Sequence, residues 1–318
     1  MTAYLIRRLA QALIIVILIS LFVFSLMRML PGDPLQLYIS ENELQLISPE
    51  ARQALLIQFG LDKPAPIQYF NWIFNILHGD FGTSLFYDEN VIVLISERLP
   101  ITLHLSILAL IIASVFGITA GLISALRRGG ILDTIVTSLA NFGISIPIFW
   151  MGILFIYLFG LYLRWLPIGG YTSPFTDFWL STRQLIMPVF CLSVVSLASK
   201  ARLTRSSILE VIRQDYVRTA WSKGLQERVI VLRHVLKNGL IPVITMIGMQ
   251  LSHIIGGSVL IETVFNIPGM GRLIVSSVFA LDYPVVQGCS LLFACIVVMV
   301  NIIVDITYVW VDPRIRFG

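Results

Sequence analysis

Long apolar stretches alternate with shorter polar segments along the chain, and six of these stretches are long enough for transmembrane helices. A helix needs about 20 apolar residues to cross the bilayer core. Transmembrane β-strands are shorter and alternate apolar with polar positions, which these stretches do not. We therefore predict an all-α polytopic membrane protein whose six transmembrane helices lie at about residues 9–30, 101–126, 134–163, 184–203, 239–261 and 285–309.

The first stretch has two interpretations. Arg7 and Arg8 precede it, as basic residues precede the apolar region of a signal peptide. However, the stretch is long for such a region, and the sequence LMRMLPGDP follows it instead of a small-residue cleavage site. We expect it to remain as a membrane anchor.

Composition supports the membrane class. Of the 318 residues, 57% are hydrophobic and only 13% are charged, about half the charged share of soluble domains. Cys191, Cys289 and Cys295 lie in apolar runs without CxxC spacing, so we interpret them as small buried residues. Neither a disulfide framework nor a metal site is expected.

The basic residues are unevenly distributed between the connections. Residues 200–237 hold nine Lys or Arg against three acidic residues, whereas residues 31–100 hold nine acidic and three basic residues. Connections rich in Lys and Arg stay in the cytoplasm. Six spans with both termini in the cytoplasm satisfy this rule at every connection, and they place 31–100 outside.

The outer segment 31–100 contains signals for two short helices. Ser48 before Pro49 is typical of an N-cap followed by proline at the first helical position. A helix over 51–59 follows, which Gly60 could end. A second helix is expected over 67–77.

The chain shows no energy source of its own. Ion-coupled transporters place charged residues inside the bilayer, but the middles of the second to sixth predicted spans contain no Asp, Glu or Lys. His104 and His253 are interpreted as packing or interface residues. No Gly-Lys pair is present for a phosphate-binding loop, and neither HExxH, GxSxG nor a cluster of metal ligands occurs. If the protein pumps, another subunit must supply the energy; otherwise it is a secondary transporter or channel that works alone.

The most basic segment, QDYVRTAWSKGLQERVIVLRHVLKN at 214–238, has the pattern of a short amphipathic helix. Arg218 and Lys223 lie away from its apolar positions, and Thr219, Ala220 and Gly224 are small enough for another protein to approach closely. Two hypotheses remain: a basic helix on anionic lipid headgroups, or a docking helix for a cytoplasmic partner. Four apolar residues fall at i, i+3, i+4 and i+8 and predict one face: Val217, Ala220, Trp221 and Leu225.

The spacing of Thr219, Ala220 and Gly224 resembles the EAA loop of the membrane subunits of bacterial ABC importers. Arg218 stands where that loop usually has glutamate, and Lys237 where it has a late proline. This variant, DYVRTAxxKGL followed by RHxLxN, is similar to the branch that imports dipeptides, oligopeptides and nickel. Other motifs of that branch occur in order: LDKPxxxQYxxW at 61–72, GDFGTS at 79–84, LPITLxL from 99, SIPIFW at 145–150, LPIGGY at 166–171, NIPGMGR at 266–272 (in place of the more usual form with an aromatic residue and Trp before Pro-Gly), DYPVVQG at 282–288 and DPRIR at 312–316.

The resemblance implies a permease subunit, not an enzyme, in the bacterial inner membrane with the type I ABC importer fold. Its implied partners are a related second permease, two ABC ATPases that bind ATP and Mg²⁺, and an extracytoplasmic solute-binding protein. This chain itself is expected to hold no cofactor or metal. No nucleic-acid partner is implied. Residues 1–95 would form the first helix and outer loop, 96–311 the five-helix core with the coupling loop at 204–238, and 312–318 a tail. The implied ATPase-coupling residues are Asp215, Arg218, Thr219, Ala220, Lys223, Gly224 and Leu225.

Small residues at intervals of four predict close helix packing in two spans. They are Gly117 and Gly121 in the second span, and Gly248, Ser252 and Gly256 in the fifth. Gly256 and Gly257 could instead mark an unwound turn.

The cargo is open. Peptides are the default, and nickel or a metal chelate is the alternative within the family. Met249 and His253, four residues apart on the fifth span, are candidates for the substrate pathway, although a methionine in an apolar helix far more often serves packing. The outer loop, with the turn at 268–272, either receives the binding protein or caps the bundle.

Overall fold

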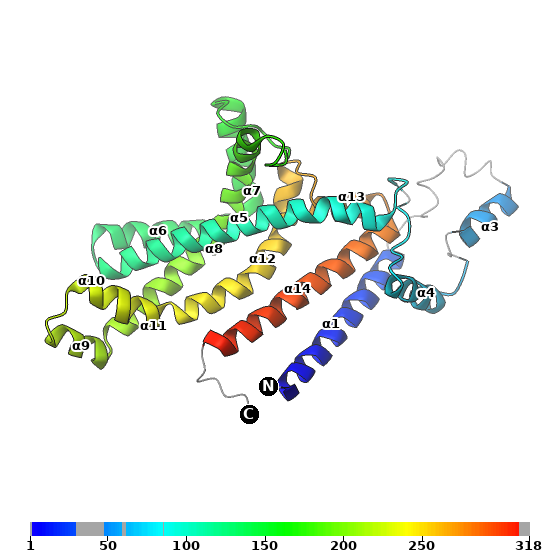
Figure 1. The fold of residues 1–318 in the computed structure, drawn as a ribbon. Helices are drawn as coiled ribbons and strands as arrows, with labels where there is room; N and C mark the ends of the chain where they lie inside the picture. Colours follow the sequence, from blue (N-terminus) through cyan, green and yellow to red (C-terminus); the bar gives the residue numbers. More distant parts are fainter. Residues whose placement is uncertain (1, 30–47, 59–61, 85, 312–318) are drawn as a thin grey trace. The chain divides into compact units, whose positions relative to one another are not determined.

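The computed structural model describes residues 2–29, 48–58, 62–84 and 86–311. Within these ranges the regular structure is helical apart from one isolated bridge between Thr83 and Asn90. This confirms the all-α fold class (Figure 1).

Among the described residues, five helices are long and apolar enough to cross a membrane, and there are six if a bent helix pair is counted as one span. The six predicted spans agree with the second count. The second and fourth helices are longer than predicted, because α5 begins ten residues earlier and α8 ends nine residues later. The five single helices are α1 (Thr2–Met29), α5 (Val91–Leu126), α8 (Phe178–Ile212), α12 (Ile241–Val264) and α14 (Tyr283–Val311).

The third predicted span is broken, which corrects the prediction of one helix over 134–163. α6 (Ile131–Ser145) ends two residues before α7 (Ile148–Phe155), which continues as the π-helix η2 (Ile156–Tyr162). The two parts meet at 100°. Pro147 lacks an N–H group and disfavours helical dihedrals at Ile146, which is extended at φ −86° and ψ 128°.

The described part of segment 31–100, which was predicted to be an outer loop, contains both expected short helices. In α3 (Pro49–Gln58) the Ala51 amide donates to Ser48 Oγ at 3.2 Å, so Ser48 caps the helix as predicted. A backbone amide and the Ser48 hydroxyl hold the pKa of Glu50 below its usual value. α4 (Ala65–Leu77) matches the second helix. The proposed end at Gly60 lies outside the described residues.

The chain divides into two compact units. The first comprises Met1–Ile101 and Gly269–Met299, including α13 (Met270–Phe279). Within it, the buried carboxylate of Asp282 accepts hydrogen bonds from Ser84 Oγ at 2.5 Å and from the Phe86 amide at 3.2 Å. Asp282 thus ties the GDFGTS motif to the start of α14.

The second unit comprises Thr102–Pro268 and Val300–Gly318, and it holds the candidate coupling segment. Within this unit α6, α7 and α12 all pack against α8. Four short elements connect α8 to α12: α9 (Asp215–Ser222), α10 (Glu227–Val229), the π-helix η3 (Ile230–Leu236) and α11 (Lys237–Gly239).

The small residues chosen from the sequence differ in what surrounds them. A Cβ added at Gly117 would lie 2.8 Å from the Leu197 carbonyl oxygen, and one at Gly248 would lie 2.6 Å from Val304. Ser252 donates to Asn301 at 3.4 Å. α12 runs unbroken through Gly256, so the alternative of an unwound turn is wrong.

We expect Gly121→Ala to lower the free energy of unfolding by about 1–3 kcal/mol, the usual cost of overpacking. The added Cβ would lie 2.5 Å from the Ala201 carbonyl oxygen and 2.6 Å from Thr204 Cβ. Gly256→Ala is the matched control, because its Cβ would meet nothing within 4 Å and alanine is the better helix former. Unfolding of both variants in mixed detergent micelles checks the prediction, which equal losses would contradict.

Candidate functional site

The predicted docking helix is α9, and one side of it is buried against the same chain. Val217 is fully buried and Ala220 is 6% exposed. Both pack against Ile208 of α8 and Ala125 at the end of α5. The small size of Ala220 therefore serves a contact within this chain. We call these residues the α9 base: Ala125, Ile208, Val217, Ala220, Ile230 and Val235.

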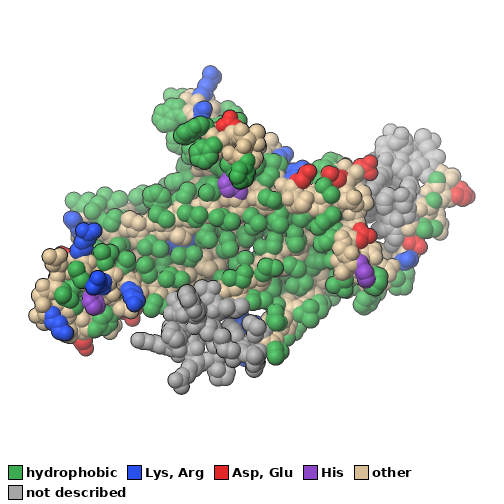
Figure 2. Space-filling model, in the orientation of Figure 1, with side chains coloured by type: hydrophobic (Ala, Val, Ile, Leu, Met, Phe, Trp, Pro, Cys, Tyr) green, Lys and Arg blue, Asp and Glu red, His purple; other side chains and the backbone are tan. Residues whose placement is uncertain are grey.

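The rest of the α9 surface is exposed and carries apolar and basic side chains. Trp221, one turn after Val217, is 49% exposed, and Leu225, beyond the end of α9, is 40% exposed, so the predicted face is buried only at Val217 and Ala220. Figure 2 shows Lys and Arg side chains over this end of the molecule, where α9, α10 and α11 lie. We call the following residues the α9 outer surface: Tyr216, Arg218, Trp221 and Leu225.

The remaining candidate coupling residues lie around this surface. Thr219 and Lys223 are exposed. Arg218 and Asp215 form an ion pair at 3.7 Å, with their side chains 72% and 98% exposed. Such exposed pairs contribute little to stability, so both side chains are free to exchange this contact for a partner.

Gly224 follows α9 with φ +72°, and its amide donates to the Trp221 carbonyl at 2.9 Å. An added Cβ would meet no atom of the chain within 4 Å. The left-handed backbone is therefore sufficient reason for glycine here, since L residues rarely adopt it.

This conformation predicts different results for two substitutions at Gly224. Gly224→Val should loosen the end of α9, at a cost of about 1–3 kcal/mol, whereas Gly224→Asn should be tolerated because asparagine adopts positive φ more readily. Amide hydrogen exchange over 215–230 in the two variants provides the measurement. Equal disruption by both would show that the absence of a side chain matters, not the backbone angle.

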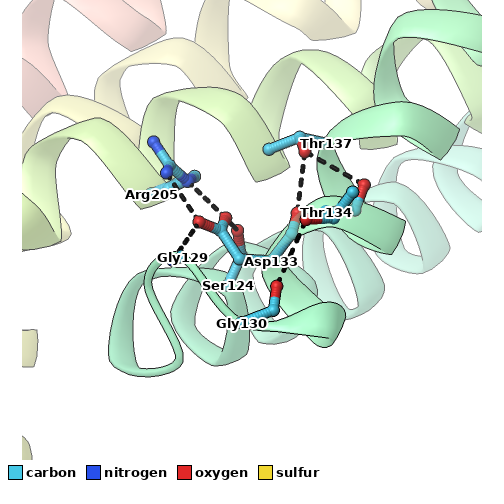
Figure 3. A network of polar contacts seen from close by, with 7 residues as sticks. All are labelled: Ser124, Gly129, Gly130, Asp133, Thr134, Thr137 and Arg205. Atoms are coloured by element: carbon cyan, nitrogen blue, oxygen red, sulfur yellow. Dashed lines mark hydrogen bonds and ion pairs between the residues drawn. The ribbon is translucent and has the colours of Figure 1, made fainter.

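A partly buried ion pair and its hydrogen bonds join three helices close to the α9 base (Figure 3). Arg205 of α8 donates to the Asp133 carboxylate from Nε at 2.7 Å and from Nη2 at 2.8 Å. Ser124 Oγ donates to Asp133 at 2.5 Å, and the Gly129 amide at 2.9 Å. We call these four residues the Asp133 anchor. It fixes the end of α5, the turn that follows, the start of α6 and the last part of α8 to one another.

The anchor and the α9 base are continuous along two helices. Ser124 of the anchor precedes Ala125 of the base in α5, and Arg205 lies three residues before Ile208 in α8. A displacement of α9 would therefore move the ends of α5 and α8 and the start of α6 together. This arrangement suits the transmission of a movement from the surface into the bundle.

This ion pair was not predicted from the sequence. Asp133 lies one residue outside the predicted span 134–163, and Arg205 was counted with the basic loop. The usable signal was an aspartate at the start of an apolar helix, where a charge needs a partner. Its partner is 72 positions away and could not be named from spacing.

Charged residues do occur in two of these helices, outside the span middles to which the prediction referred. Lys200 in α8 and Glu262 in α12 are both fully buried. Lys200 Nζ donates to Ser196 Oγ at 2.7 Å, and Thr102 Oγ1 donates to Glu262 at 2.7 Å. They escaped notice because they lie at or just beyond the ends of the predicted spans.

Met249 and His253 lie on one exposed side of α12 with Gly256 and Leu260. No group of three or more His, Cys, Asp or Glu able to hold a metal ion occurs among the described residues. His104, the other imidazole considered, is 3.1 Å from the Tyr171 hydroxyl. Cys191 and Cys289 are buried, as predicted, and Cys295 is partly buried; all three are free thiols.

Two family models match nearly the whole chain. The "Binding-protein-dependent transport system inner membrane component" matches residues 117–317, and the N-terminal component of the same systems matches residues 1–106. The chain belongs to this family. It is a multi-pass inner-membrane permease subunit of a binding-protein-dependent ABC transporter, a transport component and not itself the ATPase.

Curated relatives match over the full length. A putative peptide transport system permease protein of Brucella abortus (strain 2308) is 42% identical over 320 residues, covering 100% of both chains. The di/tripeptide transport system permease protein DppB of Pseudomonas aeruginosa (strain UCBPP-PA14) is 39% identical and covers 99% of both chains.

Solved structures support the fold. An inward-facing MetNI methionine ABC transporter chain has a TM-score of 0.54 at 17% identity, covering 70% of this permease and 97% of that chain. The identity is too low to carry substrate or site assignments, so this similarity supports the ABC importer permease fold alone. Membership of the family implies ATPase and binding-protein partners.

Proposed function

We propose that this permease imports di- or oligopeptides delivered by an extracytoplasmic binding protein, and that the α9 outer surface docks in a cleft of an ABC ATPase. The full-length relatives are named as peptide permeases, which supports the cargo class. In the proposed complex this chain pairs with a related second permease, and two ATPases bind ATP and Mg²⁺. Both termini of the chain lie in the cytoplasm.

The observation that carries the docking proposal is the uneven burial of α9: part of its surface is buried against this chain, and the rest is exposed. Its outer surface presents an aromatic residue, an aliphatic residue and a basic residue to solvent: Trp221, Leu225 and Arg218. Trp and Arg are the residues that most often dominate binding energy at protein interfaces. Its inner side is fixed to the ends of α5 and α8.

This arrangement supports a mechanical sequence. Closure of the two ATPases on ATP displaces α9, the α9 base moves with it, and the Asp133 anchor carries α6 along. The bundle then rocks from inward-open to outward-open. Met249 and His253, on the exposed side of α12, would face the cargo path or the second permease.

The outer loop is proposed to receive the binding protein together with the turn at 268–272. α3 supplies a capped, structured element for this contact. Deletion of 48–60 should then abolish the stimulation of ATPase activity by the binding protein while ATP hydrolysis without it persists. Unchanged stimulation would favour a loop that only caps the bundle.

Reconstitution of the four membrane and ATPase subunits with the binding protein in vesicles tests the cargo. We expect ATP-dependent uptake of a labelled dipeptide that unlabelled dipeptide, but not Ni²⁺, competes away. Uptake of ⁶³Ni²⁺ instead would contradict the peptide proposal. Dipeptide uptake by this chain alone would contradict the ATPase mechanism and favour a self-sufficient transporter.

A further inference from the structure

An apolar groove of about 490 Å³ lies between α8 on one side and α6 and α7 on the other. It occupies the angle made by the break after Ser145. Its wall is formed by apolar side chains and glycine throughout, including Leu139, Phe142, Trp150, Leu154 and Phe190. Most of these side chains are well exposed, so the groove is open at the surface.

The groove continues into a smaller hollow that is polar and basic. This hollow has a volume of about 270 Å³ and shares Val136, Ala140 and Ala201 with the groove. Its remaining walls are Thr137, Asn141, Arg202 and Arg205. The combined cavity therefore has a long apolar part and a cationic end.

The positive charge at this end belongs to Arg202. Arg205 is neutralised by its two hydrogen bonds to Asp133. Arg202 is exposed and donates to the amide oxygen of Asn141 at 3.3 Å. In the described part of the chain, no carboxylate lies within ion-pair distance of Arg202. An anion can thus approach Arg202 without displacing an existing ion pair.

Arg202 also lies at the depth where a headgroup is expected. It follows the apolar run of α8, which ends near residue 201, and the basic segment begins there. Basic residues at the ends of transmembrane helices reach the headgroup region and attract anionic lipids. A groove for hydrocarbon and a cation at headgroup level together match one molecule.

We propose that this cavity binds an anionic phospholipid, with an acyl chain in the groove between α6, α7 and α8 and the phosphate against Arg202. The peptide cargo fits the groove poorly, because its backbone N–H and C=O groups would lose their hydrogen bonds against an apolar wall. An acyl chain has no such groups. The lipid would fill the angle between α6 and α7 beside the Asp133 anchor.

Photo-crosslinking tests this site in the assembled importer. The complex is reconstituted in phosphatidylcholine vesicles with a trace of phosphatidylglycerol that carries a diazirine on its acyl chain, and labelled residues are mapped by mass spectrometry. We expect labelling within 139–155 and 186–197. Unlabelled phosphatidylglycerol should compete about fivefold more effectively than phosphatidylcholine, the factor expected from one basic residue near an anionic group.

Three variants make the result specific. Arg202→Gln should remove the preference for phosphatidylglycerol but leave the groove labelled. Arg128→Gln removes the same charge from the exposed turn after α5, outside the cavity, and should keep the preference. Val136→Trp, where the two hollows join, should abolish labelling. An unlabelled groove in the wild type, covered by another subunit, would overturn the proposal, as would equal competition by the two lipids.

Discussion

Asp133→Asn is expected to lower the free energy of unfolding of the permease by about 3 kcal/mol. The substitution removes the charge that faces Arg205 and weakens an acceptor for Ser124 and the Gly129 amide. Breaking a buried ion pair typically costs 3–5 kcal/mol, because the remaining charge stays without compensation. The lower end applies here, since the Arg205 side chain is 28% exposed. Unfolding of the purified protein in mixed detergent micelles measures the loss.

The matched control for this prediction is Asp215→Asn. It removes the same charge from an ion pair that is almost fully exposed, where the contribution to stability is about 0–1 kcal/mol. A large loss for Asp133→Asn beside a negligible one for Asp215→Asn would establish that the buried position matters. Similar losses in the two variants would show that the anchor is not a structural element.

Trp221→Ala is expected to weaken ATPase binding at least about 30-fold while leaving insertion and unfolding unchanged. Trp221 is 49% exposed on the α9 outer surface, and truncating an aromatic residue that dominates an interface commonly costs 2 kcal/mol or more. Dipeptide uptake should fall with ATPase binding. Binding of the purified ATPase to the permease in nanodiscs, followed by uptake in vesicles, checks both expectations.

Phe175→Ala is the control, because it also removes an exposed aromatic side chain but at a position outside α9. Phe175 is 99% exposed on the connection before α8, away from the coupling segment. This variant should bind the ATPase as the wild type does. If Trp221→Ala also bound normally, α9 would not be the docking element, and a basic helix resting on lipid headgroups would become the better interpretation.

Much of the architecture was predictable because its signals are local. Hydropathy identified the membrane helices, and Ser48 with Pro49 marked the start of α3. The spacing of Thr219, Ala220 and Gly224 located α9 and its family. None of these predictions required knowledge of distant residues, since each depends on the solvation or hydrogen bonding of neighbouring positions.

The prolines show where local signals stop being sufficient. Pro147 separates α6 from α7 at 100°, whereas α5 continues through Pro100 and α8 through Pro188. All three lack the amide hydrogen and crowd the preceding turn. Whether the helix continues depends on packing around each proline, which sequence spacing does not reveal.

The sequence by itself determined the membrane class, the approximate spans, the candidate docking segment and the family. The tertiary structure alone decided that Val217 and Ala220 are buried while Trp221 and Leu225 stay partly exposed, and that Asp133 meets Arg205. The physical reason is the range of the interactions. Transfer into a bilayer and helix capping act on neighbouring residues, whereas burial and ion pairing join side chains that only the folded bundle brings together.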